Sequence, residues 1–212
     1  NGKIANKNGE SKWVTNSLCR KRVQLLRSEN DGILIGKNSI IIDNPRLNLR
    51  DQFDKIENKP IFILDTNFEL SDSENLLIFD KLGREKVNII TNREPKEVAS
   101  KVSDFFKGVN FEKSVKEHGL LNIEEILKII SRTGVNRLLV EGGARVWTSF
   151  IKTGFFDEIV MFTGNSIIND SSISCFNDFL PLDTRLRDFP NLTLISLLKW
   201  KDNIEARWIP NS

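Results

Sequence analysis

Residues 138–144 read Leu-Leu-Val-Glu-Gly-Gly-Ala, an apolar run that passes through two glycines into a stretch of helical composition. The pattern predicts a buried strand, a tight turn and a helix that begins at about Ala144. Backbone N–H groups at a helix start lack partners within the helix, so they attract anions, and glycine lets a phosphate approach the backbone closely. We expect this turn at the carboxyl edge of a parallel sheet, where ligands bind in α/β proteins. A glycine pair needed only for a tight bend explains the same residues equally well.

Short apolar runs alternate with helical patterns along the rest of the chain, as in α/β proteins. The expected strands cover residues 32–36, 61–64, 87–91, 137–140 and 157–162, and the expected helices cover residues 16–29, 123–132 and 144–152. Thr15 and Asn122 are the expected N-caps of the first two helices. Residues 192–200 and 203–208 predict a terminal antiparallel hairpin. We therefore predict one α/β domain over residues 1–212, with a mixed, mostly parallel sheet that is flanked by helices on both faces and ends in that hairpin.

Composition and charge exclude several classes of protein. Of 212 residues, 39% are hydrophobic and 28% are charged, which is typical of a folded globular chain. Lys and Arg outnumber Asp and Glu by 31 to 29, a net charge of +2, so no strong field attracts nucleic acid or an anionic membrane. Apolar runs such as residues 33–35 and 40–42 fall far short of the roughly 20 residues that cross a bilayer.

Cysteine and histidine usage argues against a disulfide framework and a metal site. Cys19 and Cys175 lie far apart in sequence, and we interpret them as reduced thiols of a cytoplasmic protein. His118 is the only histidine, so a zinc site of the His/Cys kind is not expected, and its polar surroundings favour a solvated loop. Because the chain begins at Asn1 and its only methionine is Met161, we expect a processed product or a piece of a longer protein.

Two further features are candidates for ligand contacts. Residues 9–13 read Gly-Glu-Ser-Lys-Trp, a loop suited to clamping a planar or phosphorylated ligand, although a polar surface loop with one anchoring tryptophan fits as well. Glu141 places a carboxylate at the end of a buried strand beside the predicted phosphate cradle. We favour a ligand contact there over a structural pairing with a lysine or a turn cap. In contrast, Arg20-Lys21-Arg22 is interpreted as an exposed helix face without function.

Residues 39–50 read Ser-Ile-Ile-Ile-Asp-Asn-Pro-Arg-Leu-Asn-Leu-Arg. Pro45 stops any helix, which leaves several side chains on a turn near the end of the strand at 32–36. Arg27, at the end of the preceding helix, is expected to approach Arg50 on that turn. Two converging arginines suit a phosphate, which they bind in a bidentate manner, whereas a solvated position is the ordinary alternative for arginines in loops.

In this order and spacing, these clusters resemble the reductase domain of riboflavin biosynthesis. Residues 1–5, Asn-Gly-Lys-Ile-Ala, are similar to the family element DGKIA, and residues 9–15 are similar to GESKWIT. The segments at 25–27, 43–47 and 140–143 follow at the family's intervals. The resemblance implies the fold of dihydrofolate reductase and an NADPH-dependent reduction of 5-amino-6-(5-phosphoribosylamino)uracil to its ribitylamino product, by hydride transfer to ribose C1.

The resemblance also assigns roles to individual residues and implies partners. It implies a substrate site made of Ser11, Arg27, Leu47, Arg50 and Glu141. It implies an NADPH site made of Trp13, Ser39, Asp43, Gly142, Gly143, Ala144, Arg145 and Val146. Lys3 and Asp43 are the candidates for handling the proton that accompanies hydride transfer. The resemblance further implies that the protein is a cytoplasmic homodimer and works with a deaminase that is either fused or separate.

Two other readings remain open at this point. One is another dihydrofolate-reductase-like NADPH enzyme with a pteridine substrate. The other is a non-catalytic nucleotide-binding domain that pairs with a deaminase. Support for the second comes from residues 165–169, which read Asn-Ser-Ile-Ile-Asn where the family usually carries a Pro-Lys-x-x-Gly element. We prefer the enzyme, because the proposed ligand residues are intact.

Overall fold

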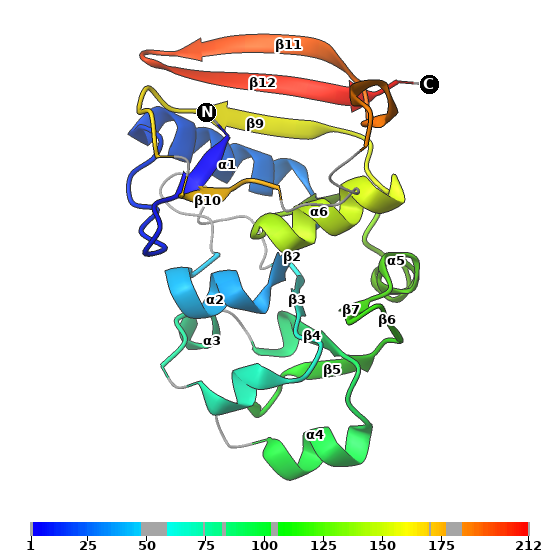
Figure 1. Ribbon diagram of the computed structural model, residues 1–212. Coiled ribbons are helices and arrows are strands. Elements are labelled where there is room, and N and C mark those ends of the chain that lie inside the picture. The colour runs from blue at the N-terminus through cyan, green and yellow to red at the C-terminus, as the bar shows by residue number, and fades with distance from the viewer. Residues whose placement is uncertain are drawn as a thin grey trace. The chain divides into compact units, whose positions relative to one another are not determined.

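The computed structural model describes residues 2–47, 59–73, 75–81, 84–102, 106–169, 171–176 and 184–211 (Figure 1). The chain forms two compact units, one of residues Gln24–Gly143 and one of residues Asn1–Val23 together with Ala144–Ser212. Helix α1 (Ser17–Glu29) begins in the second of these units and ends in the first. Within the described ranges, no helix is long and apolar enough to cross a membrane.

The unit Gln24–Gly143 contains a five-stranded, wholly parallel sheet with the strand order β5-β4-β3-β2-β8. Its strands are β2 (Gly32–Gly36), β3 (Ile61–Leu64), β4 (Val87–Thr91), β5 (Asn110–Lys113) and β8 (Leu138–Val140). The expected bounds of β2, β3 and β4 are confirmed. All residues of β2 and β4 are buried, as expected for strands covered on both faces.

Helices and a phenylalanine cluster complete this unit. The helices are α2 (Lys37–Asp43), α3 (Ile78–Lys81), α4 (Pro95–Lys101) and α5 (Ile123–Ser131), with short 3-10 turns at Glu69–Asp72 and Arg84–Lys86. Phe106 lies in the core edge-on to Phe68 and Phe79, with ring centroids 5.5 and 5.3 Å apart. The Asn122 side chain accepts a hydrogen bond from the Glu125 N–H at 2.9 Å, which confirms Asn122 as the cap of α5.

A small hairpin of β6 (Lys116–Glu117) and β7 (Leu120–Leu121) carries the histidine. His118 and Gly119 form its turn with φ values of +48° and +86°, the left-handed conformation that two-residue hairpin loops favour. His118 is exposed, so its interpretation as a solvated loop residue is confirmed.

The other unit contains an antiparallel sheet with the strand order β11-β12-β9. The expected terminal hairpin is confirmed as β11 (Leu192–Trp200) and β12 (Asn203–Pro210). The hairpin lies in this three-stranded sheet, in which β12 pairs antiparallel with β9 (Ile159–Thr163), and not in the five-stranded parallel sheet. The remaining elements are β1 (Lys3–Ala5), β10 (Ile173–Ser174), α6 (Ala144–Thr153) and a 3-10 turn at Leu186–Asp188.

The start of α1 differs from the expectation in two respects. Asn16 rather than Thr15 caps the helix, because its Oδ1 accepts hydrogen bonds from the N–H groups of Leu18 and Cys19 at 3.0 and 3.1 Å. Arg22 is not on an exposed face. Its side chain is 13% exposed and pairs at 3.4 Å with the fully buried Glu205 of β12.

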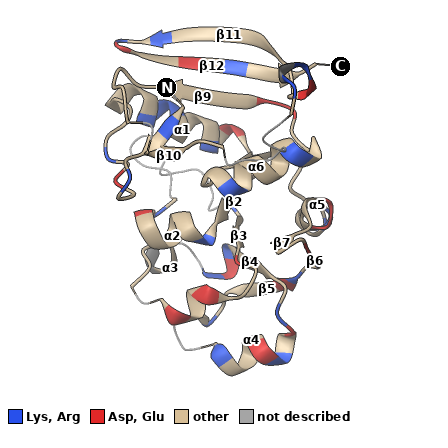
Figure 2. Ribbon diagram, in the orientation of Figure 1, with Lys and Arg blue, Asp and Glu red and all other residues tan. Residues whose placement is uncertain are grey.

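Charges along the chain are mixed in sign. Figure 2 shows Lys and Arg interspersed with Asp and Glu through the elements, in keeping with the net charge of +2.

Candidate functional site

A bidentate ion pair joins Arg27 and Glu141. Arg27 lies in the last turn of α1, and Glu141 directly follows β8. Arg27 Nε donates to Glu141 Oε1 at 2.5 Å, and Arg27 Nη2 donates to Oε2 at 2.7 Å. The Glu141 N–H donates to the Leu34 carbonyl of β2 at 2.8 Å, so the backbone that carries the carboxylate is itself fixed. Sequence reasoning singled out both residues for the substrate but did not pair them.

The sequence predicts that Arg27 binds a phosphate together with Arg50, whereas in the structure its guanidinium pairs with a carboxylate. Two of its donors face a carboxylate, and the two side chains are only 13% and 20% exposed. Charge-assisted bidentate pairs of this kind are among the strong hydrogen bonds of proteins and hold both partners in one geometry. Arg50, the other predicted phosphate ligand, lies outside the described residues.

Ser39 and Gly143 lie side by side. Ser39 is on α2, which follows β2, and Gly143 follows β8. Because β2 and β8 are neighbouring parallel strands, their carboxyl ends meet at the same edge of the sheet. A Cβ added to Gly143 would lie 3.4 Å from the Ser39 hydroxyl oxygen. The structure thus brings together two residues predicted to bind the cofactor, because even a methyl group at residue 143 would be in van der Waals contact with the Ser39 hydroxyl. A hydroxyl beside glycine backbone is a donor set that fits a dinucleotide phosphate.

The segment after β2 forms a helix that sequence reasoning missed. Residues 37–43 form α2, and Asn44, with φ +40°, ends it in the left-handed conformation just before Pro45. Asp43 is exposed at the last position of this helix. Leu47 has φ +45°, and its side chain is buried in the hydrophobic core. Its side chain is therefore committed to packing, and we expect a ligand contact at Leu47 to come from the backbone.

The other unit carries Ser11 and Trp13 in the loop before α1. The Ser11 carbonyl accepts a hydrogen bond from the Val14 N–H at 3.2 Å, which closes a turn around Trp13. The Trp13 side chain is 70% exposed, and the guanidinium carbon of Arg20 lies 4.1 Å from the centre of its ring. Arg20 is exposed, as expected for this face of the helix, and it also contacts a predicted cofactor residue.

Lys3 is anchored within the same unit. Its Nζ donates to Ser174 Oγ at 3.0 Å, across the antiparallel pair of β1 and β10. Sequence reasoning missed Ser174, because a two-residue strand has no recognisable periodicity and its partner lies 171 positions away.

Ala144, Arg145 and Val146 form the first turn of α6, directly after the glycine pair. Ala144 is buried and Arg145 is exposed. Their N–H groups are among the first of the helix and have no carbonyl partner within it. The predicted helix start at Ala144 is thus confirmed, and its role in binding NADPH stays a prediction.

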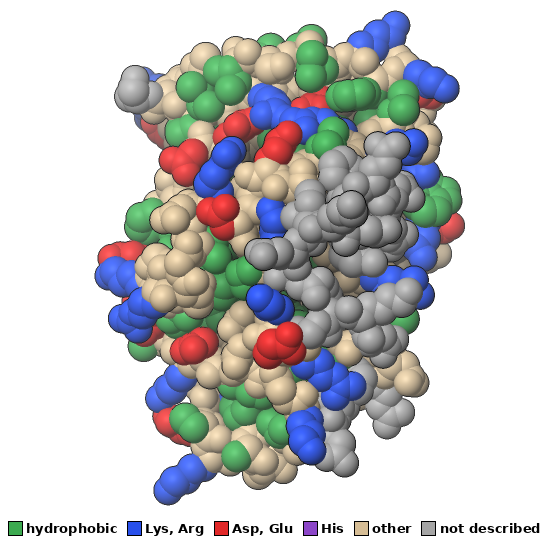
Figure 3. Space-filling view, turned by 180° about the vertical axis from the view of Figure 1, so that it is seen from behind, with side chains coloured by type: hydrophobic (Ala, Val, Ile, Leu, Met, Phe, Trp, Pro, Cys, Tyr) green, Lys and Arg blue, Asp and Glu red, His purple; other side chains and the backbone are tan. Residues whose placement is uncertain are grey.

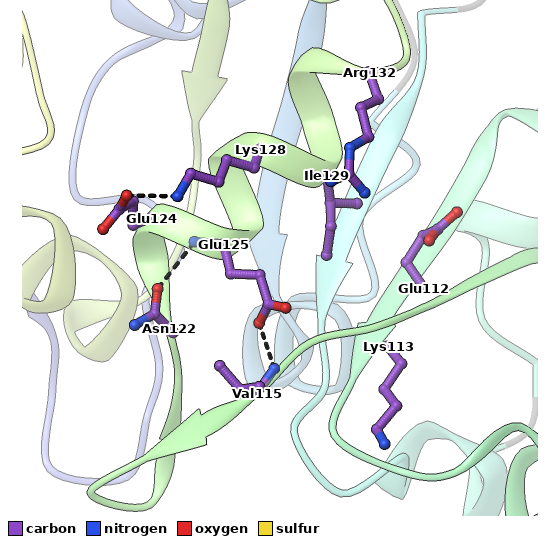
Figure 4. Close-up of a pocket in the computed structure, with 9 residues that line it drawn as sticks. All are labelled: Glu112, Lys113, Val115, Asn122, Glu124, Glu125, Lys128, Ile129 and Arg132. Carbon is purple, nitrogen blue, oxygen red and sulfur yellow. Dashed lines mark hydrogen bonds and ion pairs between the residues drawn. The ribbon is translucent and has the colours of Figure 1, made fainter.

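A surface hollow of about 400 Å³ lies beside α5 (Figure 4). Its central carboxylate, Glu125, accepts hydrogen bonds from the Val115 N–H and the Ser114 hydroxyl. Lys128 pairs with Glu124 at its rim. These charges already have protein partners, so we do not assign the hollow a ligand. Among the described residues, no three or more His, Cys, Asp or Glu side chains are arranged to hold a metal ion.

The hydrogen bonds to Glu125 predict a pH-dependent contribution to stability. Donation from the Val115 N–H, and then from the Ser114 hydroxyl, lowers the pKa of Glu125 below its ordinary value of 4.5. Stability from this carboxylate is therefore fully present above the unfolded-state pKa and is lost as the pH falls through the folded-state pKa.

We expect Glu125→Gln to lower the free energy of unfolding at pH 7 and to have a smaller effect near pH 3, as measured by urea denaturation. Glu124→Gln, at the neighbouring exposed position, is the control. A Glu125→Gln effect that is constant between the two pH values would contradict the prediction.

Comparisons with known proteins place these features in context. The family model of the RibD C-terminal domain matches residues 1–178. The riboflavin biosynthesis protein RibD of Aquifex aeolicus is 36% identical over 170 residues, which cover 80% of this chain and 44% of that protein. The chain spans about half the length of the curated relatives it matches.

Solved structures share the fold. RibD of Acinetobacter baumannii superimposes with a TM-score of 0.81 at 22% identity, covering 99% of this chain and 55% of that one. The Thermotoga maritima diaminohydroxyphosphoribosylaminopyrimidine deaminase/5-amino-6-(5-phosphoribosylamino)uracil reductase superimposes with a TM-score of 0.79 at 24% identity, covering 99% and 53%. The predicted α/β fold, with a mostly parallel sheet and a C-terminal antiparallel hairpin, is confirmed by these likenesses.

Proposed function

The chain belongs to the RibD C-terminal domain family, and on that premise we propose that it reduces 5-amino-6-(5-phosphoribosylamino)uracil to the ribitylamino product with NADPH. The observation that carries the proposal is the coincidence of the family match with the paired Arg27 and Glu141. The substrate is the one named for the reductase activity of the Thermotoga maritima protein. The reaction converts a sugar carbon into a reduced, open-chain carbon, so it requires a hydride and a proton.

NADPH supplies the hydride when it is bound. We assign its binding to Ser39, Gly142 and Gly143, with Trp13, Asp43 and the first turn of α6 (Ala144, Arg145 and Val146). The proximity of Gly143 to the Ser39 hydroxyl supports the assignment, since a phosphate needs backbone N–H groups and hydroxyl donors without an intervening side chain.

Glu141 and Arg27 are assigned to the substrate. A carboxylate offers about four lone-pair positions, so Glu141 has acceptor capacity for substrate N–H groups beyond its two hydrogen bonds from Arg27. The ion pair fixes the carboxylate before the substrate arrives, and such preorganisation reduces the cost of binding. Ser11, the backbone of Leu47, and Arg50 complete the proposed substrate site, with Arg50 assigned to the phosphate.

We assign to Lys3 the donation of the proton that accompanies hydride transfer. Reduction of the open imine form of the sugar adds a hydride to C1 and a proton to the attached nitrogen. The Lys3 ammonium donates hydrogen bonds and is oriented by Ser174, whereas Asp43 is exposed at a helix end. We therefore favour Lys3 over Asp43 as the group that donates to the nitrogen. Near-normal turnover of Lys3→Ala would remove Lys3 from this role.

The decisive experiment follows NADPH oxidation by absorbance with this chain. The proposal expects oxidation with 5-amino-6-(5-phosphoribosylamino)uracil and none with dihydrofolate. Oxidation with dihydrofolate alone would favour a pteridine reductase. NADPH binding without turnover of either substrate would favour the non-catalytic domain that pairs with a deaminase. Because the relatives are about twice as long, we also propose that this chain works with a deaminase domain, fused or separate.

A second copy of the chain is proposed as the partner of strand β11. β11 is an edge strand of the described sheet, and several of its apolar side chains are exposed. They are Leu194, Ile195, Leu197 and Leu198. Figure 3 shows hydrophobic side chains on the surface at the end of the molecule that carries β11 and β12. Edge strands of soluble monomers are usually protected by charges or bulges. β11 has a register irregularity between Leu194 and Ser196, but its only charge is Lys199 near its end. A two-fold axis through Ser196 would place apolar residues opposite apolar residues and keep the two Lys199 side chains apart.

We expect Leu197→Asp to convert a dimer into a monomer. Leu197 is 61% exposed, so the substitution adds a charge to the proposed interface without disturbing a core. Size-exclusion chromatography with light scattering gives the mass. The control is Ile167→Asp, which adds the same charge at a side chain that is 92% exposed and lies outside β11. A monomeric wild-type chain, or a dimeric Leu197→Asp variant, would contradict the proposal.

A further inference from the structure

The Arg20 side chain lies over the indole ring of Trp13. The guanidinium carbon of Arg20 lies 4.1 Å from the ring centre, within the range of a cation–π interaction. Arg20 Nη1 also donates to the Thr15 carbonyl at 2.8 Å. One side chain therefore contacts both the indole and the backbone two residues further along the loop.

The backbone beyond Trp13 is held independently of Arg20. The Asn16 N–H donates to Asn203 Oδ1 at 2.6 Å, and its side-chain amide donates to the Trp200 carbonyl at 2.7 Å. Gly164 packs directly against Val14, where an added Cβ would overlap the Val14 carbonyl oxygen. The loop is thus anchored at residues 14–16, and loss of Arg20 would release the indole more than the loop.

Most of the Trp13 side chain remains accessible to a ligand. The side chain is 70% exposed although Arg20 lies over its ring. A large aromatic side chain that is both oriented and exposed is suited to stacking on a planar ring, because stacking needs a rigid face and little loss of rotamer freedom.

We propose that Arg20 is a positioning residue, which holds the Trp13 indole so that its open face stacks on a planar ring of the bound dinucleotide. The inference rests on the proposed function, in which Trp13 contacts NADPH. Arg20 itself touches neither cofactor nor substrate. Its effect is on cofactor affinity rather than on the chemical step.

The test uses this chain and measures the dissociation constant for NADPH by the fluorescence of the reduced nicotinamide, which requires no turnover. We expect Arg20→Gln to weaken NADPH binding about three- to tenfold, from the loss of the cation–π contact and one hydrogen bond. Its kcat at saturating NADPH should stay within about twofold of wild type. Arg20→Lys should restore part of the affinity, since it keeps a cation. Lys21→Gln is the matched control, because it removes the same charge at the next, exposed position of α1.

A double-mutant cycle with Trp13→Ala separates positioning from a general structural role. In the Trp13→Ala background, Arg20→Gln should weaken binding no further. Near-UV circular dichroism, compared with Trp13→Phe, should show that Arg20→Gln removes the Trp13 signal while thermal stability is kept. Equal NADPH affinities for Arg20→Gln and Lys21→Gln would overturn the inference, as would a full loss of affinity on adding Arg20→Gln to Trp13→Ala. A wild-type chain that does not bind NADPH would instead contradict the proposed function itself.

Discussion

Glu141→Gln is expected to lower kcat/KM for 5-amino-6-(5-phosphoribosylamino)uracil by about 100-fold. The substitution removes one charge of a largely buried bidentate pair and leaves the Arg27 guanidinium without its carboxylate. Breaking one partner of a desolvated charge pair costs about 2–5 kcal/mol, and each 1.4 kcal/mol corresponds to a factor of ten. Steady-state kinetics at saturating NADPH measures the effect.

Arg27→Ala should have a similar effect, and the double variant should be little worse than either single one. Residues that act as a unit are non-additive in this way. Glu124→Gln is the matched control, because it neutralises a glutamate whose ion pair with Lys128 is exposed. A Glu141→Gln variant with more than half of the wild-type kcat/KM would remove the pair from the proposed substrate site. Additive losses in the double variant would show that the two residues act separately.

Phe106→Ala is expected to have the largest effect on stability, about 3–5 kcal/mol in the free energy of unfolding. Phe106 is 1% exposed and packs against three other rings, with centroid distances of 5.5 Å to Phe68, 5.3 Å to Phe79 and 6.3 Å to Phe111. Removing it leaves a cavity between aromatic neighbours and forfeits their edge-to-face contacts. Urea denaturation measures the loss.

Phe155→Ala is the control for this prediction. Its ring is 43% exposed, so the same truncation should cost less than about 1 kcal/mol. Phe106→Leu should lie between the two, because it keeps most of the buried volume. If Phe106→Ala and Phe155→Ala had equal effects, the phenylalanine cluster would not be the stabilising core of its unit.

The central strands were predictable because short apolar runs were bounded by clear signals. Glycines enclose β2, Pro60 precedes β3, and Asp65 follows it, so the strand bounds agree with the structure. β5 was missed, because Asn110–Lys113 is an edge strand with mostly exposed side chains and no apolar run. The partner of β9 was also missed, since pairing between distant strands leaves no local pattern.

The sequence predicted several residues of the candidate site but not the contacts between them. Arg27 and Glu141 were both singled out, but their ion pair joins positions that lie 114 residues apart and depends on the local geometry after β8. Leu47 illustrates the converse. Its motif indicates a ligand contact, whereas its side chain belongs to the hydrophobic core. The sequence does not reveal the positive φ of Leu47, which accompanies this inward placement of the side chain. Arg20 carried no signal at all, because a cation–π contact has no sequence spacing of its own.

The placement of β8 at one edge of the parallel sheet has a consequence for synthesis on the ribosome. Strands β5, β4, β3 and β2 all precede it in the chain, so four of the five strands emerge before Glu141 does. A nascent chain therefore has its aromatic core available well before Arg27 meets its carboxylate partner. Until then, the Arg27 guanidinium lacks that partner. A polypeptide that ends before residue 138 would contain the aromatic core but not the proposed substrate-binding pair.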